Sequence, residues 1–296
     1  MRPYPYLLLF MRMKYRHTHH AGNFADVHKH VTLLALLAAL KRKDKGFLYL
    51  ETHSGRGVYD LSDSAAEASA GITRLTTEEC VATELRHYLA RVAELRRSVG
   101  SARLYPGSPW LAVSELRAQD RAVLTEWQPS EARALERSLK EIPGHPRVQV
   151  VTGDGFLGLR AALPPIERRA LIFIDPPYED RRSDFERSRA ALCEAQRRFP
   201  TGVLAIWYPV KDERVAAAWQ ADLARDVGRE ALLAELWLYP RDSRVALNGS
   251  GLLILNPPYR LEESMGSWLA ELHRHLDAGH GGGTMIRRLT QSIVPG

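Results

Sequence analysis

The stretch LIFIDPPYED, from Leu171 to Asp180, joins an apolar segment directly to an acid, two prolines and a tyrosine. An apolar run without polar alternation is typical of a parallel strand that is covered on both faces. In parallel sheets, ligands bind beyond the carboxyl ends of the strands. The stretch therefore predicts a buried strand of an α/β sheet and, at Asp175, a candidate site at the end of that strand.

The same pattern recurs in LLILNPPYR, from Leu252 to Arg260, with Asn256 in place of the acid. Counted along the chain, DPPY closes the fourth predicted strand, whereas NPPY closes the seventh. By then the chain has already supplied the strands that hold a cofactor in such sheets. We therefore expect DPPY to be the working copy, and we predict that NPPY is a turn that ends an edge strand.

Strands and helices alternate along the chain on either side of DPPY. The predicted strands are FLYLE (47–51), AVLTEW (122–127), VQVV (148–151), LIFI (171–174), GVLAIWYP (202–209), ALLAELWLYP (231–240) and GLLIL (251–255), with helices at 31–40, 111–118, 130–142, 185–199 and 213–227. This alternation predicts an α/β fold with a doubly wound, mostly parallel sheet, whose last two strands form an antiparallel edge. Residues 59–103, rich in Ala, Glu, Leu and Arg, indicate a helical insertion after the first strand.

The composition is that of an ordinary globular protein. The 296 residues carry a net charge of +6, a mild preference for a polyanionic partner. Cys80 and Cys193 lie far apart without a CxxC motif, which favours a reducing, cytoplasmic setting over a disulfide framework. The apolar run 6–10 is too short to span a membrane, and no other segment is long enough. Residues 1–12 are expected to be a disordered extension or a misassigned start, with the domain occupying 13–296.

Polar and glycine residues follow the first four predicted strands directly. They are Glu51, His53, Gly55, Gly57, Glu126, Asp154, Gly155 and the DPPY residues Asp175 to Tyr178. Glu126 stands where an acid commonly accepts hydrogen bonds from ribose hydroxyls, and Asp154 could accept from an adenine amino group. Each residue alone also has an ordinary explanation, as a turn glycine or a solvated acid. Together with DPPY, they predict a site for S-adenosylmethionine.

The DPPY residues suit methyl transfer to an exocyclic amine. Hydrogen bonds from such an amine to Asp175 and to the carbonyl of Pro176 favour a tetrahedral, nucleophilic nitrogen. The consecutive prolines restrict the backbone and hold these acceptors in place. Tyr178 offers a face on which a flipped-out base can stack. Methyl transfer would then be a direct displacement, accelerated by alignment more than by acid–base catalysis.

Several ordered motifs resemble one family. YRHTHHAGNFADVHKH (15–30), FLYLETHSGRGVY (47–59), YPGSPW (105–110), LTEW (124–127), GDGF (153–156), LIFIDPPYE (171–179) and WYPV (207–210) are similar to the RlmJ family, bacterial adenine-N6 methyltransferases of 23S ribosomal RNA. The resemblance covers Met13 to the C-terminus and implies a Rossmann-like class I methyltransferase fold. It also implies S-adenosylmethionine as cofactor and N6-methyladenine as product, at adenine 2030 of 23S rRNA.

The resemblance also implies roles for individual residues. Matching positions in the family bind the cofactor at His30, His53, Ser108, Glu126, Asp154 and Gly155, and Asp175 matches the catalytic acid. Tyr15, His17 and Lys29 match a head motif associated with active-site closure and substrate engagement. Phe24 departs from the pattern, because the family has histidine there.

The residues also allow three other interpretations: a metal site, a non-catalytic RNA-binding protein and a different methyl acceptor. The histidines at 17, 19, 20, 28 and 30 could bind a metal, but no carboxylate or cysteine set with ligand spacing accompanies them, so we expect none. The basic cluster Lys41 to Lys45 would suit a non-catalytic RNA-binding protein, although a solvated helix end explains it equally well. The residues alone discriminate poorly between RNA adenine, DNA adenine and protein glutamine as substrate. We expect a monomer that acts on 23S rRNA away from membranes.

Overall fold

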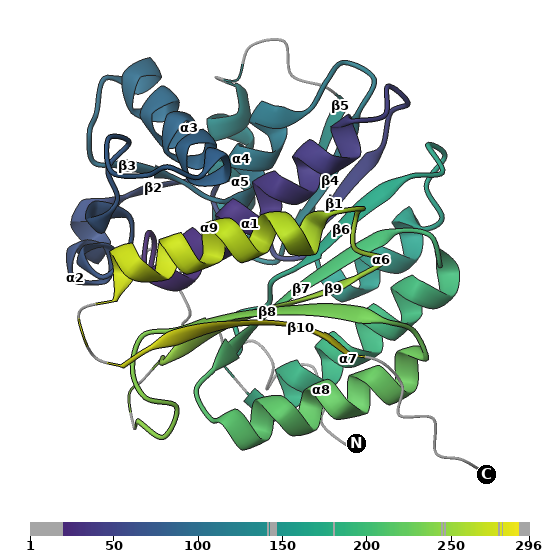
Figure 1. Cartoon of the computed structure of the whole chain (residues 1–296). Coiled ribbons are helices and arrows are strands. Elements are labelled where there is room, and N and C mark those ends of the chain that lie inside the picture. Colours follow the sequence, from purple (N-terminus) through teal and green to yellow (C-terminus); the bar gives the residue numbers. More distant parts are fainter. Residues whose placement is uncertain are drawn as a thin grey trace, which may run out of the picture.

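The computed structural model describes residues 20–140, 142, 147–179, 181–243, 245, 247–277, 279 and 281–289 (Figure 1). The expectations for residues 1–12, Met13, Tyr15 and His17 lie outside the described residues. No helix in the described part has the length and apolar character needed to cross a bilayer.

The centre of the molecule is an eight-stranded sheet in the order β10-β8-β9-β7-β6-β1-β4-β5. Its strands are β1 (Leu48–Glu51), β4 (Arg121–Glu126), β5 (Arg147–Thr152), β6 (Ala170–Ile174), β7 (Val203–Val210), β8 (Ala231–Trp237), β9 (Gly249–Leu255) and β10 (Gly283–Leu289). The five strands from β5 to β7 run parallel, whereas β9 is antiparallel to both β7 and β8. The predicted doubly wound, mostly parallel sheet is confirmed.

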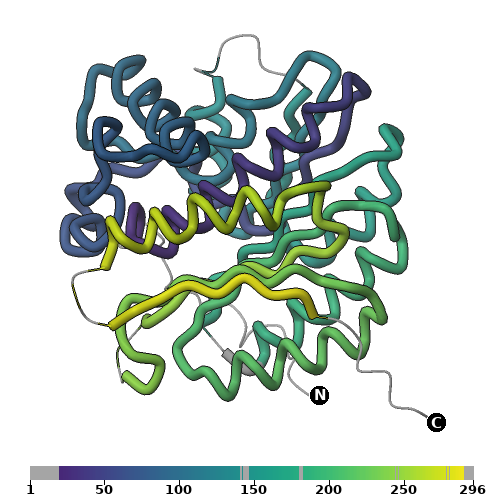
Figure 2. Tube along the Cα trace, viewed as in Figure 1, coloured from purple at the N-terminus to yellow at the C-terminus, as the bar shows by residue number. Residues whose placement is uncertain are grey.

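Helices cover both faces of the sheet, and each face has its own apolar core. One face carries α1 (Phe24–Lys41), α4 (Ser108–Glu115), α5 (Pro129–Lys140) and α9 (Leu261–Leu276); the other carries α6 (Gly155–Ala162), α7 (Arg181–Arg198) and α8 (Glu213–Val227). Helices α1 and α9 pack side by side across the first face (Figure 2). The inner strands β1, β6, β8 and β9 are buried on both sides, which explains their continuous apolar sequences.

Helix α1 begins at Phe24, seven residues before the predicted start at Val31. The side chain of Asn23 caps the helix by accepting the backbone N–H of Asp26 at 2.9 Å. The first two turns contain polar residues that resemble a surface segment in the sequence, yet His28 and Lys29 are buried. Burial of polar side chains in a helix calls for specific partners, and these lie in the site described below.

The insertion after β1 contains α2 (Ala65–Ser69), α3 (Thr83–Val99) and the single-turn helices η4 (Leu61–Ser64) and η5 (Ile72–Arg74). The short strands β2 (Val58–Asp60) and β3 (Leu104–Pro106) pair with each other at its base. Sequence reasoning predicted the helices but not this pair, which brings the two ends of the insertion together. Helix α3 packs against α1 and α9.

The predicted position of NPPY at an edge strand is wrong. Strand β9 lies inside the sheet, between β7 and β8, and all seven of its residues are buried. The edge is formed by β10, which sequence reasoning did not predict. Its middle residues are partly exposed and include Arg287 and Arg288, as suits a strand with one open side. Strands β8 and β9 are antiparallel to each other, as expected.

Candidate active site

A cavity of about 490 Å³ opens at the carboxyl edge of the parallel strands, beside the first turns of α1. Its walls come from α1, from the insertion and from the segments that follow β1, β4, β6, β7 and β8. They include Lys29, His30, His53, Gly55, Ser108, Glu126, Trp127, Asp175, Pro176, Tyr178, Trp207 and Tyr239. Because these segments are far apart in sequence, only the parallel sheet brings their side chains to one place.

The DPPY segment leaves β6 and enters this cavity. Tyr178 takes a left-handed backbone conformation, with φ of +51°, and so turns the chain sharply after the two prolines. Its hydroxyl donates to the carbonyl oxygen of Trp207 at 2.8 Å, and its ring packs against Phe185 and Trp207. Only 4% of Tyr178 is exposed, so most of its ring surface is already covered. These contacts fix the position of Asp175 and Pro176.

Lys29 links the DPPY acid to the start of α1. Its ammonium lies 2.6 Å from Oδ2 of Asp175 and 2.9 Å from Oδ1 of Asp26. Burial alone would lower the pKa of Lys29, but the two carboxylates outweigh it and raise the pKa above its ordinary value. The ammonium therefore stays charged at neutral pH. It also lies 5.5 Å from the centre of the Trp207 ring, in cation–π range.

The glycine turn after β1 is tied to the acid after β4. The backbone N–H of Gly55 donates to Oε2 of Glu126 at 2.8 Å, and that of Gln128 donates to Oε1 at the same distance. Burial raises the pKa of Glu126, and these backbone donors oppose the rise. Gly55 has φ of +63°, and a Cβ at this position would overlap the Tyr59 hydroxyl, so a side chain there would be strained.

Glu51 ends β1 as a fully buried acid. The hydroxyl of Ser108 donates a short hydrogen bond to its Oε1, while Oε2 has no hydrogen-bond partner among the described residues. Burial raises the pKa of Glu51 to about 8. Tyr49, two residues earlier in β1, interacts with this carboxyl, and its buried hydroxyl is a donor that the chain itself offers.

Two histidines, His30 and His53, also line the cavity. His30 contacts the hydroxyl of Tyr105 through Nδ1 at 2.8 Å and stacks on its ring. His53 packs edge-on against Phe156, and burial lowers its pKa to about 4. His53 is therefore neutral at physiological pH, and it can donate or accept a hydrogen bond without adding charge.

Known proteins with this sequence pattern are methyltransferases. A family model described as "Ribosomal RNA large subunit methyltransferase D, RlmJ" matches residues 44–288. The chain belongs to this family. It is 40% identical over 278 residues to ribosomal RNA large subunit methyltransferase J of Escherichia coli, covering 92% of this chain and 98% of that protein. The Haemophilus influenzae protein of the same name is 38% identical over 268 residues, covering 89% and 94%.

A solved structure agrees. A Legionella pneumophila protein superposes with a TM-score of 0.80 at 38% identity, covering 90% of this chain and 98% of that one. The family resemblance inferred from the motifs is confirmed, and with it the Rossmann-like class I methyltransferase fold.

Most of the described residues predicted from the sequence line the cavity, but Glu51, Gly57, Asp154 and Gly155 do not. Glu51 reaches it only through its hydrogen bond with Ser108. Asp154 caps α6 by accepting the N–H groups of Phe156 and Leu157, and its Oδ2 pairs with Arg187 at 2.8 Å. A side chain at position 155 would overlap the carbonyl oxygen of Thr52, so Gly155 is required for packing. Gly57, with φ of +83°, similarly allows close packing against α5. Asp154, Gly155 and Gly57 therefore have structural roles in this structure, in capping and in close packing.

Sequence reasoning missed two tryptophans and an acid at the site. Trp127 follows Glu126 directly and is 44% exposed, which is unusual for so large an apolar side chain. Trp207 lies in β7 beside Lys29, and Asp26 holds the other side of that ammonium. Trp127 directly follows the end of β4, a position that could have indicated its role. Trp207 lies within β7, and its sequence position gave no such signal.

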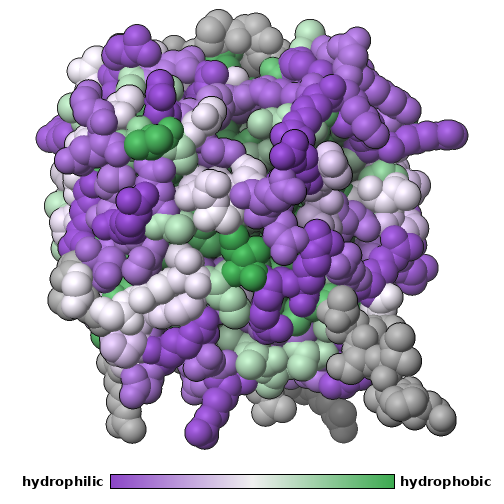
Figure 3. Space-filling view, in the orientation of Figure 1, coloured by the Kyte–Doolittle hydropathy of each residue, from purple (hydrophilic) through white to green (hydrophobic). Residues whose placement is uncertain are grey.

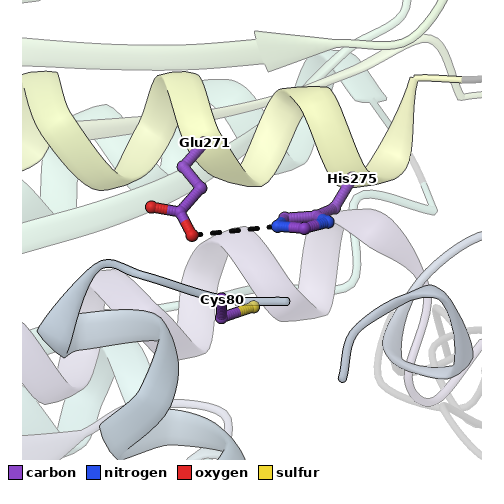
Figure 4. Close-up of side chains that lie close together, drawn as sticks. All are labelled: Cys80, Glu271 and His275. Atoms are coloured by element: carbon purple, nitrogen blue, oxygen red, sulfur yellow. Dashed lines mark ion pairs between the residues drawn. The ribbon is translucent and has the colours of Figure 1, made fainter. Parts of the chain in front are cut away.

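The described histidines of the head segment do not converge on one point. His20 faces Glu67, His28 contacts Ser250, and His30 contacts Tyr105. Among the described residues, one cluster has side chains that could bind a metal ion. It consists of Cys80 in the insertion and of Glu271 and His275 on α9 (Figure 4). Glu271 accepts the N–H groups of Val81 and Ala82 at 2.5 and 2.9 Å, and burial raises the pKa of the Cys80 thiol to about 11. This group is explained by its role in joining the insertion to α9.

The two PPY motifs lie at opposite ends of the strands, DPPY at the carboxyl ends of the parallel strands and NPPY at their amino ends. Because β9 is antiparallel to β7, its carboxyl end lies beside the amino end of β7. Asn256 donates to the carbonyl oxygens of Pro200 and Gly202, which precede β7, at 2.8 and 2.7 Å. Only DPPY therefore opens into the cavity.

Proposed function

We propose that this chain transfers a methyl group from S-adenosylmethionine to the N6 atom of an adenine in 23S ribosomal RNA, at adenine 2030. Family membership supports methyl transfer, and the names of the E. coli and H. influenzae relatives specify large-subunit rRNA. The observation that carries the proposal is the position of Asp175 and Pro176 in one cavity with Ser108 and Glu126. This arrangement suits an amine acceptor beside a nucleoside site, and a cytoplasmic setting fits a ribosomal RNA substrate.

The chain's own residues fit the proposed cofactor. Glu51 accepts a hydrogen bond from Ser108 and so positions this cavity-lining hydroxyl for a polar group of the cofactor. Glu126 is held by two backbone donors and can accept further hydrogen bonds from ribose hydroxyls. Trp127 offers an exposed ring face beside this acid for a nucleobase. When bound, S-adenosylmethionine supplies an electrophilic methyl group on a sulfonium centre.

Asp175 and Pro176 prepare the acceptor nitrogen. Lys29 occupies Oδ2 of Asp175, so Oδ1 is the oxygen that can accept an N–H of the adenine amine. The carbonyl of Pro176 can accept the other N–H, and the two bonds align the nitrogen lone pair with the methyl group. Lys29 is positioned by Asp26 and holds the Asp175 carboxylate in its orientation. The proton released after transfer leaves through solvent at the cavity mouth.

The target base requires an apolar surface in the cavity. Tyr178 is largely covered, and so we assign it to the support of the DPPY turn and to partial contact with the base. Trp207, which Lys29 and Tyr178 both contact, offers the second ring. Stacking on such rings is worth about 1–3 kcal/mol per base and would offset the cost of extruding the adenine.

The direct experiment is to incubate the protein with unmodified 23S rRNA and labelled cofactor, digest the RNA and identify the labelled nucleoside. We expect N6-methyladenosine at a single position. Label in DNA adenine but not in RNA would favour the DNA enzyme, and cofactor-independent RNA binding without transfer would favour the non-catalytic alternative. Either result would overturn the proposal.

A further inference from the structure

Two motifs that the proposed reaction does not use lie together at the amino ends of the parallel strands, at the end of the sheet opposite the cavity. These are the basic turn Lys41–Lys45 after α1 and the NPPY turn after β9. They meet where the guanidinium of Arg42 donates to the carbonyl oxygen of Tyr259 at 3.4 Å. Both turns lie at the amino ends of the parallel strands, so they form a surface distinct from the active site.

The basic turn is held by two arginines beneath it. The guanidiniums of Arg117 and Arg169 each lie 6.0 Å from the centre of the Phe47 ring. Arg117 donates to the carbonyl of Lys43 at 3.1 Å, and Arg169 donates to that of Leu40 at 2.6 Å. These bonds cap the carboxyl end of α1 and fix the backbone of the turn. The exposed side chains of Lys43 and Lys45 are thereby left for solvent or a partner.

The surface carries positive charge that nearby acids do not neutralise. Arg42, Lys43, Lys45 and Arg168 are exposed, and none forms an ion pair within the described part of the chain. The neighbouring acids Glu115, Asp120 and Glu167 are already paired with Lys41, Arg117 and Arg121. In the space-filling view, the rim over the turn between α1 and β1 is hydrophilic (Figure 3). Asp44 is the acid within the turn itself.

The NPPY turn adds an aromatic ring to this charge. Tyr259 is 84% exposed, although tyrosine is usually at least half covered. The turn is fixed by the two hydrogen bonds of Asn256, and both Asn256 and Arg260 take left-handed conformations, with φ of +51° and +64°. Residues other than glycine rarely adopt this backbone conformation, so the surrounding structure must hold Asn256 and Arg260 in it. The consequence is a rigid turn that presents a tyrosine ring to solvent beside Arg42.

We propose that Arg42, Lys43, Lys45, Arg168 and Tyr259 form a second RNA contact, here called the amino-edge surface. Exposed cations in a fixed array neutralise phosphates, and an exposed aromatic ring stacks on an unpaired base. The occupant is a segment of the same RNA, away from the target adenine, with its backbone over the cations and one base on Tyr259. This inference rests on the proposed function, because it requires RNA as substrate.

The test compares two double variants that lose the same charge. Lys43→Gln/Lys45→Gln alters the amino-edge surface, whereas Arg133→Gln/Arg137→Gln alters exposed positions of α5. Affinity for a long 23S rRNA fragment is measured as a function of salt. The first variant should weaken binding roughly tenfold and reduce the slope of log K against log salt by about 1.4–1.8. The α5 variant should change affinity less than about twofold; equal losses in the two variants would overturn the proposal.

The aromatic contact is tested separately with Tyr259→Ala. Loss of stacking should weaken binding of the long fragment at least about fivefold without changing the salt slope. All variants should methylate a short oligonucleotide that reaches only the cavity at the native rate. Unchanged binding by Tyr259→Ala would refute the aromatic contact. Failure of the native protein to methylate either RNA would refute the proposed function itself, which keeps the two claims distinguishable.

Discussion

At the scale of single residues, the candidate site holds one buried ammonium between two carboxylates. Lys29 is 6% exposed, and Asp26 and Asp175 are 3% and 12% exposed in their side chains. Without the ammonium, two carboxylates would face each other in a poorly hydrated pocket, where their repulsion is costly. Lys29 therefore serves both the fold and the proposed chemistry.

We predict that Lys29→Met lowers the rate of methyl transfer at least about 100-fold and the free energy of unfolding by about 3–5 kcal/mol. Single-turnover kinetics and urea unfolding measure the two effects. Lys41→Met is the matched control, because it also removes an ammonium from an ion pair on α1, with Glu115, away from the cavity. A Lys29→Met enzyme with a near-native rate would contradict the assignment.

The buried acid Glu51 predicts a pH dependence of stability. Its pKa of about 8 in the folded protein exceeds the ordinary value of 4.5, so between these values the folded state holds a proton that the unfolded state has lost. Stability of the cofactor-free protein should therefore fall as pH rises through this window, by up to about 1.4 kcal/mol per pH unit from this group. Thermal or urea unfolding from pH 5 to 8 measures it. Glu51→Gln should flatten the profile, and an equally steep profile in that variant would reject the assignment.

Sequence reasoning identified acids and glycines of the site because their chemistry is visible in the residue type. Glu126 and Asp175 were found this way, and both line the cavity. Asp26 could not be found, since its role arises only when α1 packs against β6 and places Lys29 between two acids. Asp154 was predicted to bind the cofactor, but its side chain caps α6. An acid between a strand and a helix can serve either as a ligand-binding residue or as a helix N-cap, and the sequence pattern does not distinguish the two.

At the scale of elements, the turn before α6 shows how closely a helix must approach a strand. Gly155 lies against the backbone of Thr52, which cannot move without disturbing β1, whereas no atom lies within 4 Å of a Cβ built on Gly153. We predict that Gly155→Ala destabilises the protein by about 2 kcal/mol or more, while Gly153→Ala changes stability by less than about 0.5 kcal/mol. Urea unfolding compares the pair, and equal effects would contradict the packing argument.

Element positions were predictable where the apolar pattern was strong and continuous. β1, β4, β6 and β7 were found close to their bounds for that reason. The start of α1 was missed because buried polar residues resemble a surface segment. The neighbours of β9 were also missed, since residue type encodes burial and not which strand pairs with which. β10 was missed because an edge strand with arginines lacks the apolar run of an interior one.

At the scale of the whole molecule, the insertion is held against the main domain by contacts with α9. Glu271 of α9 accepts two backbone N–H groups at the start of α3, and Arg74 donates to the carbonyl of Leu276 at 2.6 Å. The insertion also forms part of the cavity wall through Ala66 and Ala70. Its attachment therefore affects the shape of the active site.

We predict that Glu271→Ala lowers the free energy of unfolding by about 1–2 kcal/mol, because two partly buried backbone donors lose their charged acceptor. Hydrogen exchange at Val81 and Ala82 should accelerate, while exchange in β6 should accelerate only as much as the loss of global stability requires. Glu263→Ala, at an exposed position of the same helix, is the control. Unchanged protection at residues 81 and 82 would show that Glu271 does not hold the insertion.

The central claim is that Asp175 prepares the acceptor amine at one end of the cavity while other residues hold the cofactor. Asp175→Asn removes the charge and keeps the shape, so it separates these two functions. The decisive measurement is the single-turnover rate of methyl transfer to 23S rRNA by this variant, together with its affinity for S-adenosylmethionine. We predict a rate at least about 100-fold lower with cofactor affinity within about twofold of native. A rate within about threefold of native would contradict the account.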